Sequence, residues 1–282
     1  MAKHSKIEWT HHTFNPWWGC TKVSPACAHC YAETWAQRLA LDLWGRSSSR
    51  RFFTDDYWRQ PAKWNEEAQR DRVRRRVFCA SMADVFEGRP ELDIWRDRLW
   101  PLIESTPWLD WLLLTKRPQN VARMVSWKEG WPDNVWLGVT AENQRWADQR
   151  IPLLLSLPAR VRFTSAEPLL GPLSLAQWLK SAGNAKRFPA LDWIIAGGES
   201  GHGARPTHPD WIRALRDECQ QSDVAFHFKQ WGHWTPTVPR GIIAKQTITI
   251  GGDTNAPRLL YGVGKSVAGR SIDGATWDQF PS

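Results

Sequence analysis

Short apolar, β-branched runs alternate with amphipathic stretches of helical length along most of this chain, and this order constrains the fold more than any other feature. Consecutive strands that have a helix between them pair in parallel through right-handed crossovers. Runs such as WLLLT and DWIIAGG are apolar throughout, as is typical of strands covered on both faces. The pattern predicts an α/β fold with about six βα units, forming a full or partial (β/α) barrel. An open doubly wound sheet is the alternative.

The expected strands are 77–80, 111–115, 135–140, 161–164, 193–196 and 225–229, with a less clear strand near 13–18. The expected helices are 31–43, 92–105, 119–127, 143–156, 175–181 and 209–222. After about residue 234 the helical pattern stops, and Gly, Pro and Thr become frequent. We therefore expect a barrel-like domain over residues 1–234, with an inserted loop near 46–65, and a small β-rich extension over 235–282.

Three of the five cysteines lie in one short segment, NPWWGCTKVSPACAHCYA. Cys20, Cys27 and Cys30 read Cys-x6-Cys-x2-Cys, whereas Cys79 and Cys219 stand alone in the sequence. Three thiolates at one point are soft ligands that suit an iron–sulfur cluster or zinc. A [4Fe–4S] cluster held by three cysteines leaves one iron without a protein thiolate, and a substrate or cofactor can bind there.

Composition favours a globular protein of the cytoplasm. The chain has 282 residues, of which 42% are hydrophobic and 23% charged. No apolar run is long enough for a membrane helix, and the first residues, MAKHSKIEWT, lack the apolar core of a secretion signal. We therefore expect no membrane association, and reduced cysteines that bind metal in preference to forming disulfides. No G-x-S-x-G, H-E-x-x-H or P-loop motif supports hydrolase or nucleotide-triphosphate chemistry.

The formal net charge of +8 points to a polyanionic partner. Basic residues gather at 46–51 and 70–76, and a basic face most often attracts nucleic acid. The ordinary explanation for the second cluster is a solvated helix, because Glu66, Glu67 and Asp71 alternate with it. Most of the 21 tryptophans should pack in the core, and a few exposed ones can stack on bases. Nucleic acid or a nucleotide is the expected partner.

Polar residues follow almost every predicted strand, which is where parallel barrels collect their catalytic groups. Gly197 and Gly198 let a ligand approach the backbone, and Glu199 can receive an amine or ribose hydroxyls. Lys116 and Arg117 can hold a carboxylate or phosphate. Each residue alone also has an ordinary explanation as a turn residue, cap or ion-pair partner. The further residues at strand ends are Cys79, Ser81, Asp84, Thr140, Glu142, Asn143, Ser165, Glu167 and Gln230.

The cysteine triad after the first strand, with a glycine- and acid-containing strand end later, resembles the radical S-adenosylmethionine superfamily. The phrases NPWWGCTKVSPACAHCYA, LLLTKRP, NVWLGVTAEN, SAEPLLGP, IIAGGESG and FKQWG are similar, more closely, to a family of phage- and prophage-encoded proteins of poorly defined function. These phrases extend from Asn15 to Gly232. The common superfamily spacing is Cys-x3-Cys-x2-Cys, and here the first gap has six residues.

The resemblance implies a [4Fe–4S] cluster on Cys20, Cys27 and Cys30, with S-adenosyl-L-methionine on the fourth iron. An external donor would supply one electron, and the resulting 5′-deoxyadenosyl radical would abstract hydrogen from the substrate. The implied reaction is repair or modification of DNA, RNA or a nucleotide, of lyase or transferase type, and a protein partner is an additional expectation. Expected cofactor-binding residues are Tyr31, Ser81, Asp84, Thr140, Glu142, Glu167, Gly197, Gly198 and Glu199. Expected catalytic residues are Lys116, Glu167 and Cys79, the last as a thiol hydrogen donor.

Two other readings of the triad stay open. A zinc-bound nucleic-acid-binding protein would complete a tetrahedron with a histidine, for which His29, His11 and His12 are nearby. A dithiol redox protein would use the pair Cys27-Ala-His-Cys30, although the third cysteine and the order of elements argue against it.

Overall fold

The structure is a computed structural model that describes residues 3–127, 129–179, 189–251 and 256–281. The main sheet has seven strands in the order β1-β2-β3-β4-β5-β6-β7, and a small antiparallel sheet follows in the sequence. In a partial (β/α) barrel, parallel strands follow one another in sequence order. In a doubly wound sheet, the strand order reverses at a switch point. The predicted fold class is therefore confirmed. The described part of the chain contains no helix both long and apolar enough to cross a bilayer.

The chain divides into two compact units. The first contains Met1–Ser24, Ala32–Val139 and Leu153–Arg162. The second contains Pro25–Tyr31, Thr140–Pro152 and Phe163–Ser282. The predicted boundary near residue 234 stays a prediction.

The strands of the first unit share one fully buried layer of side chains. They are β1 (His12–Thr13), β2 (Arg75–Cys79), β3 (Leu109–Thr115) and β4 (Val135–Thr140), the last residue of β4 belonging to the second unit. The parallel register sets Val77 beside Trp111 and Trp111 beside Val135. All three side chains are completely buried, as expected for strands covered on both faces.

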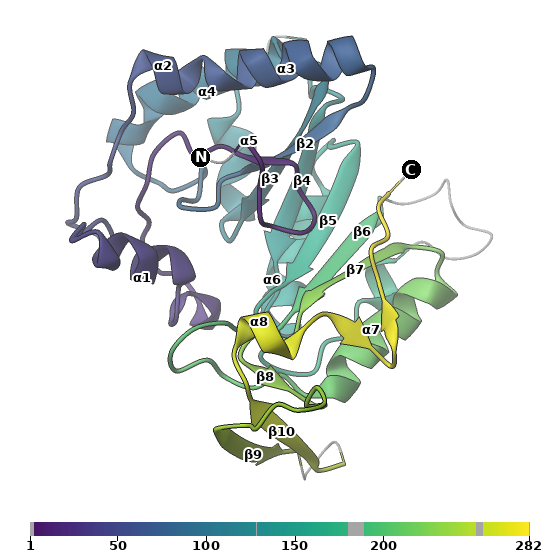
Figure 1. Cartoon of the computed structure of the whole chain (residues 1–282). Coiled ribbons are helices and arrows are strands. Elements are labelled where there is room, and N and C mark those ends of the chain that lie inside the picture. The colour runs from purple at the N-terminus through teal and green to yellow at the C-terminus, as the bar shows by residue number, and fades with distance from the viewer. Residues whose placement is uncertain (1–2, 128, 180–188, 252–255, 282) are drawn as a thin grey trace. The chain divides into compact units, whose positions relative to one another are not determined.

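The helices of the first unit are α1 (Tyr31–Arg38), α2 (Asp55–Trp58), α3 (Gln60–Asp71), α4 (Asp93–Glu104) and α5 (Val121–Met124), with 3-10 turns at Pro90–Leu92 and Pro118–Asn120. Figure 1 shows α2, α3 and α4 together beside the strands, and α1 away from them. The predicted loop near 46–65 therefore holds α2 and the start of α3. The predicted helix at 31–43 ends early because Ala40 takes a left-handed conformation. The one predicted at 119–127 ends at Met124, because Val125 is extended.

The second unit repeats the arrangement with β5 (Val161–Ala166), β6 (Trp193–Gly197) and β7 (Ala225–Gln230), the first two residues of β5 belonging to the first unit. Its helices are α6 (Gln144–Leu155) and α7 (Pro209–Gln221), with 3-10 turns at Pro25–Cys27 and Ala176–Trp178. The 3-10 turn at Ala176–Trp178 replaces the helix predicted at 175–181, of which residues 180 and 181 lie outside the described ranges.

The end of the chain forms the predicted β-rich extension (Figure 1). Strands β8 (Trp234–Thr235), β9 (Gln246–Ile250) and β10 (Arg258–Gly262) pair antiparallel in the order β8-β10-β9. A one-turn helix, α8 (Lys265–Ala268), leads to the hairpin of β11 (Ser271–Ile272) and β12 (Ala275–Thr276).

The last described residues run antiparallel along β7 and satisfy its outer edge. Phe228 N donates to Trp277 O at 2.9 Å, and Gln279 N donates to Phe226 O at 3.1 Å. The side-chain oxygen of Gln279 accepts from Phe226 N at 2.9 Å. Because an unpaired strand edge is an aggregation hazard, this tail protects the sheet.

We expect Gln279→Ala to lower the free energy of unfolding by about 1 to 3 kcal/mol, because Phe226 N then loses its acceptor. Urea denaturation measures the difference. Gln221→Ala, which changes an exposed glutamine with no hydrogen bond among the described residues, should stay within about 0.5 kcal/mol of the wild type. Equal stability of the two variants would contradict the role assigned to the tail.

Candidate functional site

The backbone around Cys20 packs tightly against the loop over residues 43–50. Gly19 has φ +110°, and a Cβ there would lie 2.4 Å from Leu43 O and 2.7 Å from Arg50 Cδ. Only glycine therefore fits before the first cysteine. Gly19 N donates to Met82 O, and Gly45 N donates to Cys20 O, at 3.0 and 3.1 Å. The loop over 43–50 thus holds the Cys20 backbone in one position.

The buried guanidinium of Arg50 holds that loop through several hydrogen bonds. Its side chain is completely buried and forms two hydrogen bonds with Glu87, at 3.1 and 2.8 Å. The remaining donors reach the carbonyls of Leu43 and Ser48 and the hydroxyl of Thr21, directly after Cys20. A buried charge pair of this geometry holds only when every donor is satisfied, as is the case here. Arg50 is therefore a structural clamp, although it lies in the basic cluster predicted to attract polyanions.

A second buried pair, Arg117 with Asp84, contacts Cys20 itself. Arg117 Nη1 lies 2.8 Å from Asp84 Oδ2 and donates to Cys20 Sγ at 3.7 Å, and Nη2 donates to Thr21 O at 2.6 Å. Asp84 also accepts from the hydroxyl of Thr115 and from the backbone N–H of Lys116. Asp84 is thus the strand-end carboxylate that orients a guanidinium toward the sulfur.

Burial sets the ionisation of this group of residues. Desolvation raises the pKa of the Cys20 thiol to about 12, and the nearby Arg117 charge offsets part of the increase. Burial alone would raise the pKa of Asp84, but Arg117 and the hydrogen bonds from Lys116 and Thr115 hold it below its usual value. The carboxylate is therefore charged at neutral pH, and the guanidinium can stabilise negative charge on the sulfur.

Replacing Arg50 by alanine should lower the free energy of unfolding by about 3 to 5 kcal/mol, because Glu87 would keep a buried and unpaired charge. Thermal and urea unfolding of purified protein measure the effect. The matched control is Arg46→Ala, an exposed arginine four residues earlier, for which the change should be within about 0.5 kcal/mol. A similar small loss for Arg50→Ala would refute the clamp.

In the second unit, Glu142 holds the segment that carries Cys27 and Cys30. Pro25 has no N–H group, so Ala26 carries the first N–H of the 3-10 turn Pro25–Cys27, and Ala26 N donates to Glu142 Oε1 at 3.2 Å. The other oxygen of Glu142 accepts from Arg150 Nη1 at 2.9 Å, and both side chains are buried. Arg150 Nη1 also donates to Thr140 O, which joins this contact to the end of β4.

Glu199 holds the same segment from β6. Its two oxygens lie 2.5 and 2.9 Å from the guanidinium nitrogens of Arg205, and Arg205 Nη2 donates to Pro25 O at 3.0 Å. His29 Nδ1 lies 3.0 Å from Glu199 Oε2. Burial acts to raise the pKa of Glu199, but the hydrogen bonds from Arg205 and His29 bring it below its ordinary value. Glu142 and Glu199, two of the four carboxylates predicted to bind the cofactor, therefore anchor the cysteine segment in this structure.

Gly197, the last residue of β6, and Gly198 both lie against protein atoms. A Cβ on Gly198 would be 2.0 Å from Trp231 O, and one on Gly197 would be 2.5 Å from Glu167 Oε1. Gly198 N donates to Gln230 O at 2.9 Å, so the backbones after β6 and β7 run in direct contact. Close packing between these chain segments accounts for the glycine at position 198.

Gly198→Ala should destabilise the protein by about 3 kcal/mol or more, since the added methyl overlaps a backbone carbonyl that cannot move freely. Gly88→Ala is the control, because its Cβ would meet Arg123 Nη2 at an ordinary 3.6 Å. Thermal unfolding distinguishes the two. A Gly198→Ala protein of normal stability that binds S-adenosylmethionine poorly would instead support direct contact with a ligand.

The other predicted residues occupy varied environments. Cys79 is completely buried, and burial raises the pKa of its thiol. Tyr31 is 55% exposed at the first position of α1, and Ser81 bonds the side chain of Asn15. Lys116 is half-buried. Glu167 Oε1 lies 3.3 Å from Lys229 Nζ, at the ends of β5 and β7.

Sequence reasoning missed the anchoring roles of Arg50, Arg150 and Arg205. Each meets a carboxylate that lies 37, 8 or 6 residues away, so no helical spacing marks the pair. The one available signal was the short Glu-x5-Arg interval in GESGHGAR, which follows a predicted strand end.

The metal site stays a prediction. Cys20 belongs to the first unit, and Cys27 and Cys30 belong to the second. All five cysteines are described and none forms a disulfide. Within the described ranges, no three or more His, Cys, Asp or Glu side chains form a cluster arranged to bind a metal.

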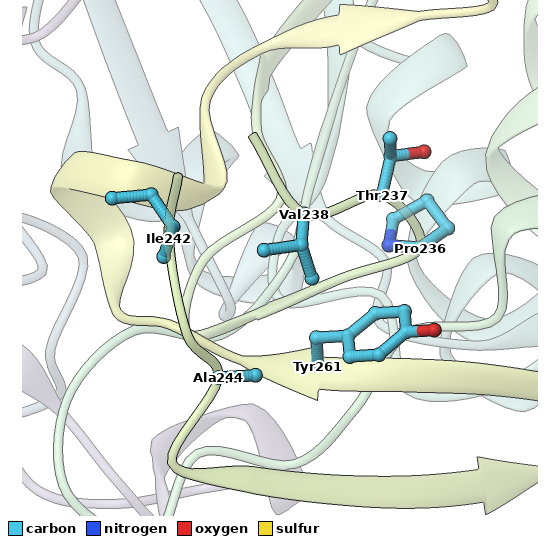
Figure 2. Close-up of a pocket in the computed structure, with 6 residues that line it drawn as sticks. All are labelled: Pro236, Thr237, Val238, Ile242, Ala244 and Tyr261. Carbon is cyan, nitrogen blue, oxygen red and sulfur yellow. The ribbon is translucent and has the colours of Figure 1, made fainter. Parts of the chain in front are cut away.

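One pocket lies on the C-terminal extension, apart from these residues (Figure 2). Figure 2 shows the ring of Tyr261 facing Val238 and Pro236, and the remaining lining residues are Thr237, Ile242 and Ala244. None of the predicted site residues lines this pocket.

The fold defines an α/β protein with a parallel, barrel-like sheet. Residues 4–281 match the family described as "Protein of unknown function (DUF5131)", and the chain belongs to that family. A search of curated proteins found no match.

Among solved structures, the chain is similar to spore photoproduct lyase. The complex of that enzyme with dinucleoside spore photoproduct aligns with a TM-score of 0.48 and 12% identity, over 92% of this chain and 70% of the other. A mutant of that enzyme with bound AdoMet and the same dinucleoside aligns with a TM-score of 0.46 and 12% identity, over 89% of this chain and 68% of the other. The resemblance to phage- and prophage-encoded proteins stays a prediction.

Proposed function

We propose that this protein is a radical S-adenosylmethionine enzyme whose [4Fe–4S] cluster is held by Cys20, Cys27 and Cys30. One observation carries the proposal. The two backbone segments that present these cysteines are each fixed by two arginine–carboxylate pairs, yet the three cysteines remain only partly buried. A purely structural cysteine would need no such support, whereas ligands of a metal centre do.

The donor set fits such a cluster. Cysteine thiolates are the usual protein ligands of an iron–sulfur cluster. Desolvation makes the Cys20 thiolate costly in the absence of metal, and Arg117 Nη1 lies 3.7 Å from its sulfur as a positive hydrogen-bond donor. Hydrogen bonds to cluster sulfurs adjust the reduction potential, so Arg117 is suited to stabilise the charge of the cluster.

Buried polar atoms at the strand ends of the second unit support a polar cofactor. Thr140 Oγ1, at the end of β4, and Gln230 Oε1, at the end of β7, have no hydrogen-bond partner within the described residues. Buried polar atoms in folded proteins are nearly always paired. Thr140 is among the residues expected to contact S-adenosylmethionine, and its hydroxyl can donate to such a ligand.

When bound, the cluster and S-adenosylmethionine supply one-electron reduction and hydrogen-atom abstraction, with an external protein or small molecule as electron donor. The chain itself orients the reactants and excludes water. Glu142 and Glu199 fix the segment of Cys27 and Cys30, and Asp84 holds Arg117 beside Cys20. Glu167 and Lys229 form a charge pair in which the lysine can pass a proton to the carboxylate or to a substrate.

The proposed substrate is nucleic acid or a nucleotide, which undergoes lesion repair or modification in a lyase or transferase reaction. The net charge of +8 supports this class, because a polyanion is attracted to a basic protein. We further propose that the enzyme acts in the cytoplasm, and that a protein partner can deliver the electron.

Anaerobically purified wild-type protein should contain about four irons and four sulfides per chain. Cys27→Ala should lose most of the iron and the brown absorption, whereas Cys219→Ala, which changes a buried cysteine outside the triad, should retain both. Metal analysis and absorption spectra test this expectation. Full iron content in Cys27→Ala would overturn the proposal.

Zinc is the second candidate, and the contact between His29 and Glu199 favours it. A carboxylate on the second ring nitrogen is a common partner of zinc-bound histidine, so His29 Nε2 could complete a site with the three cysteines. For His11 and His12, the described residues place a backbone group on one ring nitrogen, where His29 has a carboxylate. A colourless protein with one zinc per chain would favour this alternative, and an EPR signal that changes with S-adenosylmethionine would exclude it.

A further inference from the structure

Trp35 is the exception among the tryptophans. All 21 lie in described residues, and Trp35 alone is exposed, with 43% of its surface accessible. It lies on α1, whose buried side is formed by Ala32 and Ala36. Leu39 follows one turn later and is 48% exposed. Nine of the other tryptophans are buried and eleven are half-buried, so Trp35 presents the ring most available for a contact with a partner.

Trp35 and Phe52 each pack against a neighbouring aromatic ring. Trp18 packs edge-on against Trp35 with ring centroids 5.0 Å apart. The guanidinium of Arg51 lies 4.9 Å over the Trp18 ring. The next residue, Phe52, is 38% exposed and stacks on Trp95 at 4.6 Å with 7° between the planes. The exposed rings are thus held in place before any ligand binds, which lowers the entropic cost of binding.

Unpaired positive charge accompanies these rings. Arg38 lies one helical turn from Trp35 on α1, and Arg51 precedes Phe52. Both are exposed, and neither forms an ion pair within the described part of the chain. Elsewhere, Arg59, Arg74 and Arg75 each pair with an aspartate. The only acidic residue from Thr34 to Phe53 is Asp42, so this surface is positive and aromatic at once.

We propose that Trp35, Leu39, Arg51 and Phe52, with Arg38 beside them, form a docking surface for single-stranded nucleic acid. An unpaired base stacks on an exposed ring, and the phosphates contact the two arginines. A base inside a duplex has no accessible face for stacking, so the surface selects a single strand or an unstacked nucleotide. The inference rests on the nucleic-acid part of the proposed function, and is independent of the metal.

Fluorescence anisotropy with a labelled oligothymidylate at fixed salt tests the surface. Trp35→Ala should weaken binding by about 5- to 100-fold, the range found when a stacking aromatic is removed, and Trp35→Phe should restore most of the affinity. Arg51→Ala should reduce the slope of log affinity against log salt concentration by about 1, because one phosphate contact is lost. Ile243→Ala, which changes a side chain that is 92% exposed in the C-terminal extension, is the matched control and should bind as the wild type does.

The outcomes separate this inference from the proposed function. Circular dichroism confirms that each variant is folded, and iron analysis should give wild-type cluster content for Trp35→Ala. If the wild type binds no oligonucleotide, single-stranded or double-stranded, the proposed substrate class and the surface both fail. If the wild type binds and Trp35→Ala binds equally well, the surface alone is refuted, and the exposed rings then serve a protein contact.

Discussion

Four arginine–carboxylate pairs hold the segments on which the proposed chemistry depends. Arg50–Glu87 and Arg117–Asp84 fix the backbone around Cys20, and Arg150–Glu142 and Arg205–Glu199 fix the segment from Pro25 to His29. In each case guanidinium nitrogens also reach backbone carbonyls, so the pair positions a chain segment as well as neutralising a charge. Irregular loops have no ladder of backbone hydrogen bonds, and buried charge pairs that also bind backbone carbonyls take over that role.

Because several arginines are buried in ion pairs, the basic composition overstates the positive charge on the protein surface. A formal charge of +8 suggests a positive surface, yet Arg50, Arg117 and Arg150 are buried and neutralised, and much of the cluster at 70–76 pairs with Asp71 and Asp110. The positive field toward a polyanion therefore depends on the arginines that no carboxylate neutralises. Net charge predicts attraction to nucleic acid in general, while the site of attraction follows from the pairing of individual side chains.

The sequence predicted the central strands well, since β4 coincides with the predicted 135–140 and β6 and β7 differ from their predictions by one residue. Strands buried on both faces carry a strong, local apolar signal. The helix ends were less predictable, because the left-handed Ala40 and the extended Val125 end helices without glycine or proline. The site was predicted as a set of strand-end residues, but the partners of Glu142 and Glu199 were not, because intervals of 8 and 6 residues outside a helix follow no periodic pattern.

The same pairings constrain how a cofactor can bind. Both oxygens of Glu199 already accept hydrogen bonds from Arg205, so an amine or a ribose hydroxyl would share this carboxylate with a guanidinium that also holds Pro25 O. A ligand that weakened the contact with Arg205 would loosen the segment that presents Cys27 and Cys30. Thr140 and Gln230 present polar atoms that no neighbour occupies within the described residues, and a ligand can pair with them at no cost to the cysteine segment. The physical chemistry of the site therefore favours these uncommitted groups for direct contact and assigns the carboxylates to support.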